Sequence, residues 1–405
     1  MSQKGFFSNS ELAKTERVAS RPRCAKCGLY KKCKSPKMKG TGSGEKSILF
    51  VAEAPGKTED RDNEQLIGKA GQLLHSVSKR LGIDLDSCRK INAINCRPEG
   101  NRTPTGLEID HCRPMVWNEI AQYKPNVIIP LGAAALDSII GRDWNRGLGG
   151  ITRWRGFQIP HRELNAWVCP TYHPSYLLRK STSEAAPTIF KQDLKAAIGL
   201  ARKQVPIGAK ESQQVQIVYD EDDIIDAITE SYMKAERDDF VAFDYETTGL
   251  KPQVEGHEIV TCAICAPNIG TVAFPMTPNI YETWIKFLVS PVAKVAANIK
   301  FEEKWSQQIF GIGANNWLWD TMLAAHVIDN RRGITPLDFQ SFVNFGTPDY
   351  SSHMKQYLES GSDKKHANGF NNIHKADLEE LLLYNGIDAL LEWRLAELQM
   401  GLVKP

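Results

Sequence analysis

Short apolar runs alternate with segments of helical periodicity in the first half of the chain. Ile48–Ala52 is an unbroken apolar run, and similar runs cover Asn126–Leu131 and Trp167–Pro170. Runs of this length, bounded by turn residues, predict buried strands. Apolar positions recur at helical spacing over 73–81 and 132–140. Strands that alternate with helices predict an α/β domain.

A second α/β pattern follows a stretch that lacks periodicity. Residues 199–214 mix Pro, Gly, Lys and Gln, which is typical of a linker. Beyond it the pattern predicts strands at 215–219 and 240–245, an acidic helix at 222–233, a hairpin of 259–266 with 271–274, and then mainly helices. No internal repeat is apparent. The sequence therefore predicts two different domains, 1–200 and 215–405, joined by a linker over 201–214.

Length and composition favour a globular chain of more than one domain. The 405 residues are 42% hydrophobic and 24% charged, and a chain of this length typically folds into about two or three domains. No apolar run reaches the ~18–20 residues of a membrane span, and the polar first twenty residues exclude a secretory signal. We expect a cytoplasmic protein with no membrane partner.

The net charge of +2 conceals two halves of opposite sign. Residues 1–200 carry 32 Lys and Arg against 19 Asp and Glu, whereas residues 201–405 carry 18 against 29. A basic half favours a polyanionic partner such as nucleic acid. The acidic half indicates either a solvated surface or a set of metal-binding carboxylates.

Four of the nine cysteines have a spacing that suits a metal site. Cys24-x2-Cys27 and Cys96-x15-Cys112 offer four thiolates, enough for one tetrahedral metal or one iron–sulfur cluster. The fifteen-residue gap is not that of a usual zinc ribbon. From the spacing alone, four unrelated buried cysteines stay open as the alternative.

Neighbouring motifs help to decide between a metal site and four unrelated cysteines. Along the chain lie Glu53-Ala-Pro-Gly56, Gly68-Lys-Ala-Gly71, the segment from Cys96 to Pro104, and Pro170-Thr-Tyr-His173-Pro. Together with the cysteine spacing they resemble the iron–sulfur (family 4) uracil-DNA glycosylases over about residues 20–200. The resemblance implies an α/β/α sandwich and a [4Fe–4S] cluster held by Cys24, Cys27, Cys96 and Cys112.

The same resemblance implies roles in base excision. The target base must be flipped out of the stack, and the charge that develops on it must meet a hydrogen-bond donor. By similarity, His173 would stabilise the departing uracil, Glu53 would position water and Asn92 would read the base. The expected base-binding set also includes Gly56, Leu66 and Tyr176.

The chain departs from that family in one pocket segment. Asn63, Gln65 and Leu66 stand where the family typically has Gly and then Pro-Phe, and Ala52 replaces a glycine. Stacking of a base on an aromatic ring contributes ~1–3 kcal/mol, so its loss would cost roughly 5- to 150-fold. We expect a remodelled pocket that excises uracil or a modified base, with a retired site as the alternative.

Carboxylates also recur in the second half. Asp244 and Glu246 lie two residues apart at the end of a predicted strand, on one face and about 7 Å apart along the chain. That arrangement can bind a divalent cation. Glu302 follows a further strand, and Tyr384 precedes Asp388 by four residues on one face of a helix.

This ordered set resembles the 3′→5′ proofreading exonuclease domain of family A DNA polymerases, an RNase H-like fold, over about residues 215–405. The resemblance implies that Asp244, Glu246 and Asp388 bind two Mg²⁺ or Mn²⁺ ions, that Glu302 completes the shell and that Tyr384 orients the attacking water. The family usually has Asp at the position of Glu302. We expect the longer side chain to tune metal binding without silencing the site.

The combined hypothesis is a metal-dependent 3′→5′ DNA exonuclease fused to a glycosylase-like DNA-binding domain, acting in replication or repair. The expected partner is DNA with a single-stranded or frayed 3′ end, with or without uracil. The arrangement resembles viral replication proteins, which would place the chain in the host cytoplasm. The alternatives are a DNA- or uracil-sensing accessory of a separate polymerase chain, or the amino-terminal part of a family A polymerase.

Overall fold

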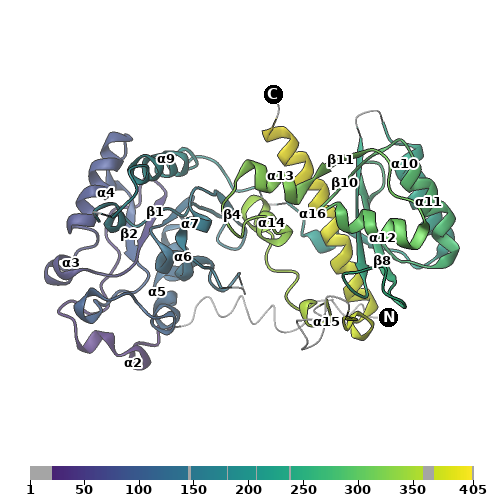
Figure 1. Ribbon diagram of the computed structural model, residues 1–405. Helices are drawn as coiled ribbons and strands as arrows, with labels where there is room; N and C mark the ends of the chain where they lie inside the picture. Colours follow the sequence, from purple (N-terminus) through teal and green to yellow (C-terminus); the bar gives the residue numbers. More distant parts are fainter. Residues whose placement is uncertain are drawn as a thin grey trace, which may run out of the picture. The chain divides into compact units, whose positions relative to one another are not determined.

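The computed structural model describes residues 21–144, 147–179, 181–206, 208–236, 239–358 and 369–403. The chain divides between residues 207 and 208 into two compact units. Each unit holds its own sheet, so the predicted α/β class is confirmed (Figure 1). Within the described residues, no helix is both long enough and apolar enough to cross a membrane.

The first unit contains a five-stranded sheet in the order β2-β1-β3-β5-β4. Its four parallel strands are β1 (Ile48–Ala52), β2 (Arg89–Asn92), β3 (Val127–Pro130) and β5 (Ala166–Val168), and β4 (Ile159–His161) is an antiparallel edge. All five residues of β1 are buried. A central parallel strand is covered on both faces, which explains the unbroken apolar run in its sequence.

Helices cover both faces of this sheet (Figure 1). Leu74 of α4 (Lys69–Arg80) and Phe190 of α9 (Ala186–Gly199) pack on one face, whereas α5 (Gly106–Tyr123) and α6 (Ala133–Ile140) contact β1, β2 and β3. The unit also has the short helices α2 (Cys24–Cys27), α3 (Lys57–Asp62), α7 (Ile151–Trp154) and α8 (Pro174–Leu177).

The second unit is built on a six-stranded sheet in the order β11-β10-β7-β8-β9-β6. Strands β7 (Phe240–Thr247), β8 (Ile259–Ala266) and β9 (Gly270–Pro275) form an antiparallel meander. The parallel pairs are made by β10 (Ala293–Ala296) with β7 and β11 (Trp317–Asp320), and by β6 (Val215–Ile217) with β9.

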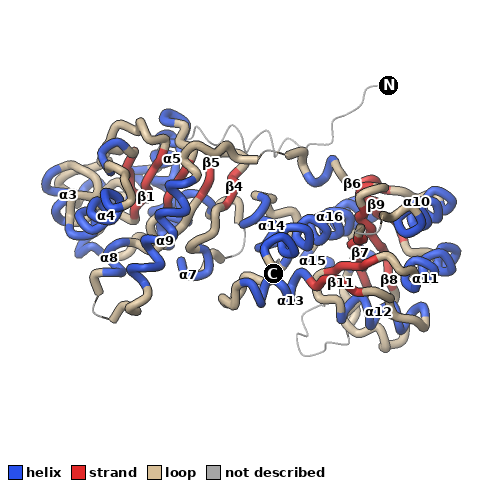
Figure 2. The backbone as a smooth tube through the Cα atoms, turned by 90° about the horizontal axis from the view of Figure 1, so that it is seen from above, coloured by secondary structure: helices blue, strands red, loops and turns tan. Residues whose placement is uncertain are grey.

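Two unlike layers of helices flank this second sheet, whose strands are drawn in red in Figure 2. One layer is aromatic and holds α10 (Glu221–Met233), α11 (Tyr281–Val289) and α12 (Lys300–Phe310). On the other face lies α16 (Leu378–Leu402). Further helices are α13 (Thr321–Ile328), α14 (Leu337–Phe345) and α15 (Lys355–Leu358).

The pair Cys262 and Cys265 illustrates the period of a strand. Both lie on β8 and are buried, Cys262 in the aromatic layer and Cys265 in the layer that holds α16. Residues i and i+3 of a strand point to opposite faces. Their CxxC spacing is therefore a packing feature and does not form a metal site.

A close approach positions α16 on the sheet. A Cβ atom at Gly386 would lie 2.3 Å from Cγ1 of Val215 and 3.3 Å from Cβ of Ala273. Glycine at this point therefore allows the helix backbone to approach the strands more closely than a side chain would permit. As a result the neighbouring residues of α16 reach β7.

Candidate functional sites

Three carboxylates from distant parts of the second unit converge. Asp244 and Glu246 come from β7, and Asp388 comes from α16. One ligand oxygen from each lies within 4.8 Å of the others. Strand alternation places Asp244 and Glu246 on the same face, and that face is the one on which α16 packs.

Asn385 joins the helix to the strand, and sequence reasoning missed it. Its Nδ2 donates to Oδ2 of Asp244 at 2.7 Å and to the Asp244 carbonyl at 3.2 Å, while its Oδ1 accepts from Thr261 at 2.9 Å. Asn385 is fully buried. Asn385 precedes Asp388 by three residues on α16. One turn of this helix therefore carries both the amide that holds Asp244 and the Asp388 carboxylate that lies beside Asp244.

Two tyrosines flank the same carboxylates. Tyr350, which sequence reasoning also missed, donates from its hydroxyl to Oδ1 of Asp388 at 2.5 Å. Its ring centroid lies 6.0 Å from that of Tyr384. Burial, followed by the charge of Asp388, raises the pKa of both phenols well above the ordinary value. Both therefore remain protonated hydrogen-bond donors at neutral pH.

Two further carboxylates are buried nearby. Glu302 on α12 and Glu392 on α16 are each 1% exposed, and Oε2 of each has no hydrogen-bond partner among the described residues. Oε1 of Glu392 accepts from the Ala297 amide at 3.1 Å. Glu302 is not part of the group within 4.8 Å, but burial and then the charge of Asp244 raise the pKa of Glu302 well above its ordinary value. Glu392 was not predicted from the sequence.

The electrostatics of this cluster favour a bound cation. Burial raises the pKa of Asp388 to about 7, partly offset by the hydrogen bonds from Tyr350 and Tyr384. Burial and then the neighbouring carboxylates raise the pKa of Glu246 and Glu392 well above their usual range. Oxygen ligands of this charge suit Mg²⁺ or Mn²⁺. Among the described residues, no donor reaches Oε2 of Glu302 or of Glu392, so each leaves a buried oxygen that a cation would satisfy.

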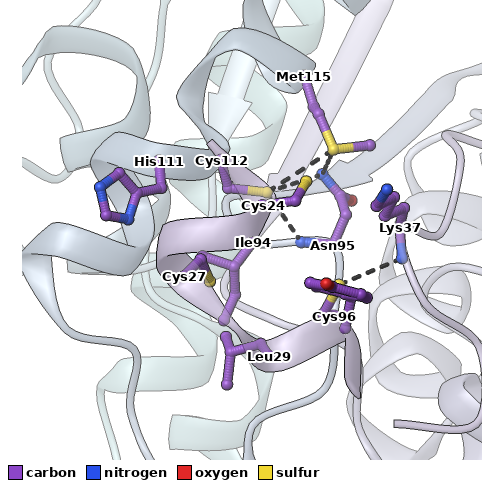
Figure 3. A pocket seen from close by; sticks show the side chains of 11 residues that line it. Cys24, Cys27, Leu29, Lys37, Ile94, Asn95, Cys96, His111, Cys112 and Met115 are labelled. Carbon is purple, nitrogen blue, oxygen red and sulfur yellow. Dashed lines mark hydrogen bonds between the residues drawn. The ribbon is translucent and has the colours of Figure 1, made fainter. Parts of the chain in front are cut away.

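The four cysteines predicted to bind a cluster line one pocket of the first unit (Figure 3). Cys24 and Cys27 come from α2, Cys96 follows β2, and Cys112 lies on α5. Leu29, Ile94 and Met115 form part of the same wall. The wide gap in the sequence between the two pairs closes in space because α2 packs against α5.

The surroundings of these thiols suit a thiolate-bound metal group. Backbone amides donate to two of the sulfurs, Lys37 to Cys96 at 3.2 Å and Asn95 to Cys112 at 3.3 Å. Hydrogen bonds to sulfur of this kind stabilise cluster thiolates. Burial raises the pKa of Cys96 to about 12 and that of Cys112 to about 11, so a positive metal centre would be needed to hold them ionised.

The predicted catalytic residues of the first unit lie at one edge of its sheet. Glu53 follows β1, Asn92 ends β2 beside Ala52, and His173 follows β5. Ligands bind at the carboxyl ends of parallel strands in such sheets. Gly132, just after β3, has a φ of +90°, and a Cβ there would lie 3.2 Å from Cβ of His173. This glycine therefore allows His173 to approach the edge.

His173 is a neutral imidazole whose tautomer is determined by its neighbours. Its Nδ1 accepts from the Ser175 backbone amide at 3.2 Å and lies 2.7 Å from the Ser175 hydroxyl. The ring proton must therefore be on Nε2. Burial, followed by the positive charge of Arg179, lowers the pKa of His173 to about 4. Burial also raises the pKa of Glu53, and Arg179 offsets part of this.

The remaining predicted base-binding residues have different surroundings. Leu66 packs in the hydrophobic core and has a φ of 57°, and a Cβ at Gly71 would lie 1.7 Å from the Leu66 carbonyl. Gly56 caps α3. Tyr176 lies on α8, 5.0 Å from Tyr172 between ring centroids. Asn92 donates from Nδ2 to Oε1 of Gln65, a contact that sequence reasoning missed.

Two family models match the two units. The model of the uracil DNA glycosylase superfamily matches residues 39–197, and that of the 3′-5′ exonuclease domain matches residues 215–397.

Three relatives illustrate the same division. The type-4 uracil-DNA glycosylase of Pyrobaculum aerophilum is 35% identical over 179 residues, which are 44% of this chain and 88% of the relative. That of Thermotoga maritima is 32% identical over 202 residues, 49% of this chain and 100% of the relative. The DNA polymerase of Bacillus phage SP01 is 28% identical over 326 residues, 73% of this chain and 34% of the polymerase.

Fold, sites and family models together define a DNA-processing chain with two unlike domains. Through its first unit the chain belongs to the type-4 uracil-DNA glycosylase family, and its second unit is a 3′-5′ exonuclease domain. The resemblances inferred from the motifs are thereby confirmed. The viral origin, the role of each site residue and the domain boundaries stay predictions.

The raised pKa of Asp388 predicts how the stability of the second unit depends on pH. The carboxyl ionises near 3.8 when unfolded but near 7 when folded, so the folded state binds the extra proton between these values. In EDTA, stability should therefore fall as pH rises from about 4 to about 7, by up to about 4 kcal/mol. Added Mg²⁺ should reverse the fall.

Thermal unfolding of wild type and Asp388→Asn, followed by calorimetry at pH 5 and pH 7.5, tests this expectation. The variant lacks the titrating group, so its melting temperature should change less with pH. A wild-type melting temperature in EDTA that rises with pH relative to the variant would contradict the assignment.

Proposed function

We propose that the second unit removes nucleotides from the 3′ end of single-stranded or frayed DNA, with Asp244, Glu246 and Asp388 as ligands of two divalent ions. The convergence of these three carboxylates within 4.8 Å is the observation that supports the proposal best. Divalent ions bound there would activate water and stabilise the attacking and leaving oxygens of a phosphodiester. Mg²⁺ or Mn²⁺ suits the all-oxygen ligand set.

The side chains around the ligands divide the remaining tasks. Tyr384, which stays protonated, would hold the attacking water through its hydroxyl. Asn385 and Tyr350 hold Asp244 and Asp388 in place by the bonds described above. Glu302, buried with one unpartnered oxygen, would complete the ligand shell. Residues that are fixed before substrate binds reduce the reorganisation needed in the transition state.

A DNA polymerase is the partner we propose for this activity. Support comes from the similarity to the Bacillus phage SP01 DNA polymerase, which extends over both units of this chain. The acidic second half would repel DNA away from its metal ions, whereas the basic first half supplies most of the favourable charge for DNA binding.

We propose in addition that the first unit excises uracil, or a related base, from DNA. The neutral His173 with its proton on Nε2 favours this second function, because an N–H donor can stabilise the negative charge that develops on a departing base. Glu53 would position the attacking water and Asn92 would read the flipped base. Cys24, Cys27, Cys96 and Cys112 would hold a [4Fe–4S] cluster that ties α2 to the body of the unit.

The exonuclease proposal predicts that Asp244→Ala stops degradation of a 5′-labelled single strand in Mg²⁺. Loss of this carboxylate, which faces Asp388 of α16, should lower the rate of strand degradation by at least roughly 100-fold. Asp222→Ala, at an exposed position on α10, is the matched control and should keep the wild-type ladder. A ladder that persists in purified Asp244→Ala would refute the assignment.

The cluster proposal predicts that Cys96→Ser lowers the iron content and the visible absorbance of the purified protein. Cys33→Ser is the matched control, because Cys33 packs in the same small apolar cluster but is not among the four proposed ligands. Iron content and melting temperature should both fall in Cys96→Ser and stay near wild type in Cys33→Ser. The reverse order would assign the ligand to Cys33.

The excision proposal predicts an alkali-sensitive break at uracil in a treated DNA strand. His173→Ala removes the Nε2 donor and should slow the reaction by roughly 100-fold. The Michaelis constant should change less than the turnover number, because the charge is present mainly in the transition state. Absence of any break with the wild-type protein would remove uracil excision from the proposal and leave the exonuclease untouched.

A further inference from the structure

The base-reading residue of the first unit belongs to a chain of buried amides. Gln65 and Asn95 are fully buried, and Asn92 is 2% exposed. Nε2 of Gln65 donates to the Lys39 carbonyl at 3.1 Å and to Oδ1 of Asn95 at 3.4 Å, and Oε1 of Gln65 accepts from Nδ2 of Asn92. The Asn95 amide nitrogen in turn lies 3.8 Å from Sγ of Cys112.

The backbone determines which way each of these amides faces. A carbonyl can only accept, so the Lys39 carbonyl requires the nitrogen of Gln65 on its side. Oε1 of Gln65 must then face Asn92, and Asn92 must present its nitrogen to Gln65. The contact between Asn95 and Cys112 agrees, because it leaves the Asn95 oxygen to accept from Gln65.

One orientation of Asn92 follows from this network. Its Nδ2 is held by Gln65, and its Oδ1 accepts no hydrogen bond among the described residues. A base whose N3 faces this oxygen must carry a proton on that nitrogen, as uracil does. Cytosine has a bare ring nitrogen there, so it would place two acceptors against each other and leave a buried polar atom unsatisfied.

We propose that Gln65 is a positioning residue that fixes the orientation of the Asn92 amide. By fixing this amide, Gln65 selects bases with a protonated N3, namely uracil and its 5-substituted derivatives. This inference rests on the base excision proposed above. Gln65 lies in the segment where the related glycosylases typically have Pro-Phe. A proline has no side-chain amide, so this constraint on Asn92 arises from the substitution in this chain.

The test compares affinities for single strands that carry one uracil or one cytosine in the same context, measured by fluorescence anisotropy. Gln65→Leu removes both the acceptor and the donor at similar volume and frees the Asn92 amide to rotate. We expect the uracil preference to fall roughly tenfold. Gln65→Glu keeps an oxygen toward Asn92, and its buried carboxyl must stay protonated to donate to the Lys39 carbonyl. This variant should restore part of the preference, which a purely structural role of Gln65 would not explain.

Gln72→Leu is the matched control, because Gln72 is exposed on α4 and its Nε2 contacts only the Ile67 carbonyl, at 3.3 Å, among the described residues. The preference of Gln72→Leu for uracil over cytosine should equal that of wild type. Thermal unfolding of each variant shows whether the first unit is folded at the assay temperature. A preference for uracil that Gln65→Leu leaves unchanged overturns the inference.

A strand-cleavage assay distinguishes a failure of this inference from a failure of the base excision on which it rests. If wild type breaks uracil strands and Gln65→Leu leaves the ratio of uracil to cytosine cleavage unchanged, base excision stands and the role of Gln65 is wrong. If wild type breaks no strand, the excision proposal fails, while the affinity ratio still decides whether Gln65 orients Asn92.

Discussion

The close packing of α16 on the second sheet is the contact on which the carboxylate cluster of the second unit depends. Asp388 lies more than a hundred residues from Asp244 and Glu246, and it reaches them because Gly386 lets the helix backbone approach β6 and β9. Asn385 then bonds to Asp244 from the same turn of the helix. Without this approach the strand would carry two acidic side chains and no third carboxylate beside them, so the carboxylate cluster is a property of helix packing as much as of residue type.

Burial gives the two sites opposite electrostatic characters. In the second unit it gathers carboxylates that repel one another, so the folded cluster is destabilised by its own charge and would be stabilised by a bound cation. In the first unit it keeps His173 neutral and surrounds Asn92 with amides, which carry no net charge. The first arrangement suits chemistry on a phosphate anion. The second suits a hydrogen-bonding surface from which water is excluded.

The first unit also shows how a family fold tolerates a changed pocket. Its strands still deliver Glu53, Asn92 and His173 to one edge, since these positions follow from where parallel strands end. The segment from Asn63 to Leu66 changes instead, and Leu66 turns into the core while Gln65 bonds to Asn92.

The sequence by itself determined the elements and the residue types, because periodicity and motif order are local. It predicted β1 and β8 to the residue, and it identified Asp244, Glu246 and Asp388 as well as the four cysteines. Short or weakly apolar strands such as β2, β4 and β11 had no such signal. Asn385, Tyr350 and Glu392 became visible only in the tertiary structure, as did the contact of Gln65 with Asn92. An amide, a phenol or a carboxyl on an ordinary helix or loop acquires a role only through the partner that packing brings to it, and in each case that partner is distant in sequence.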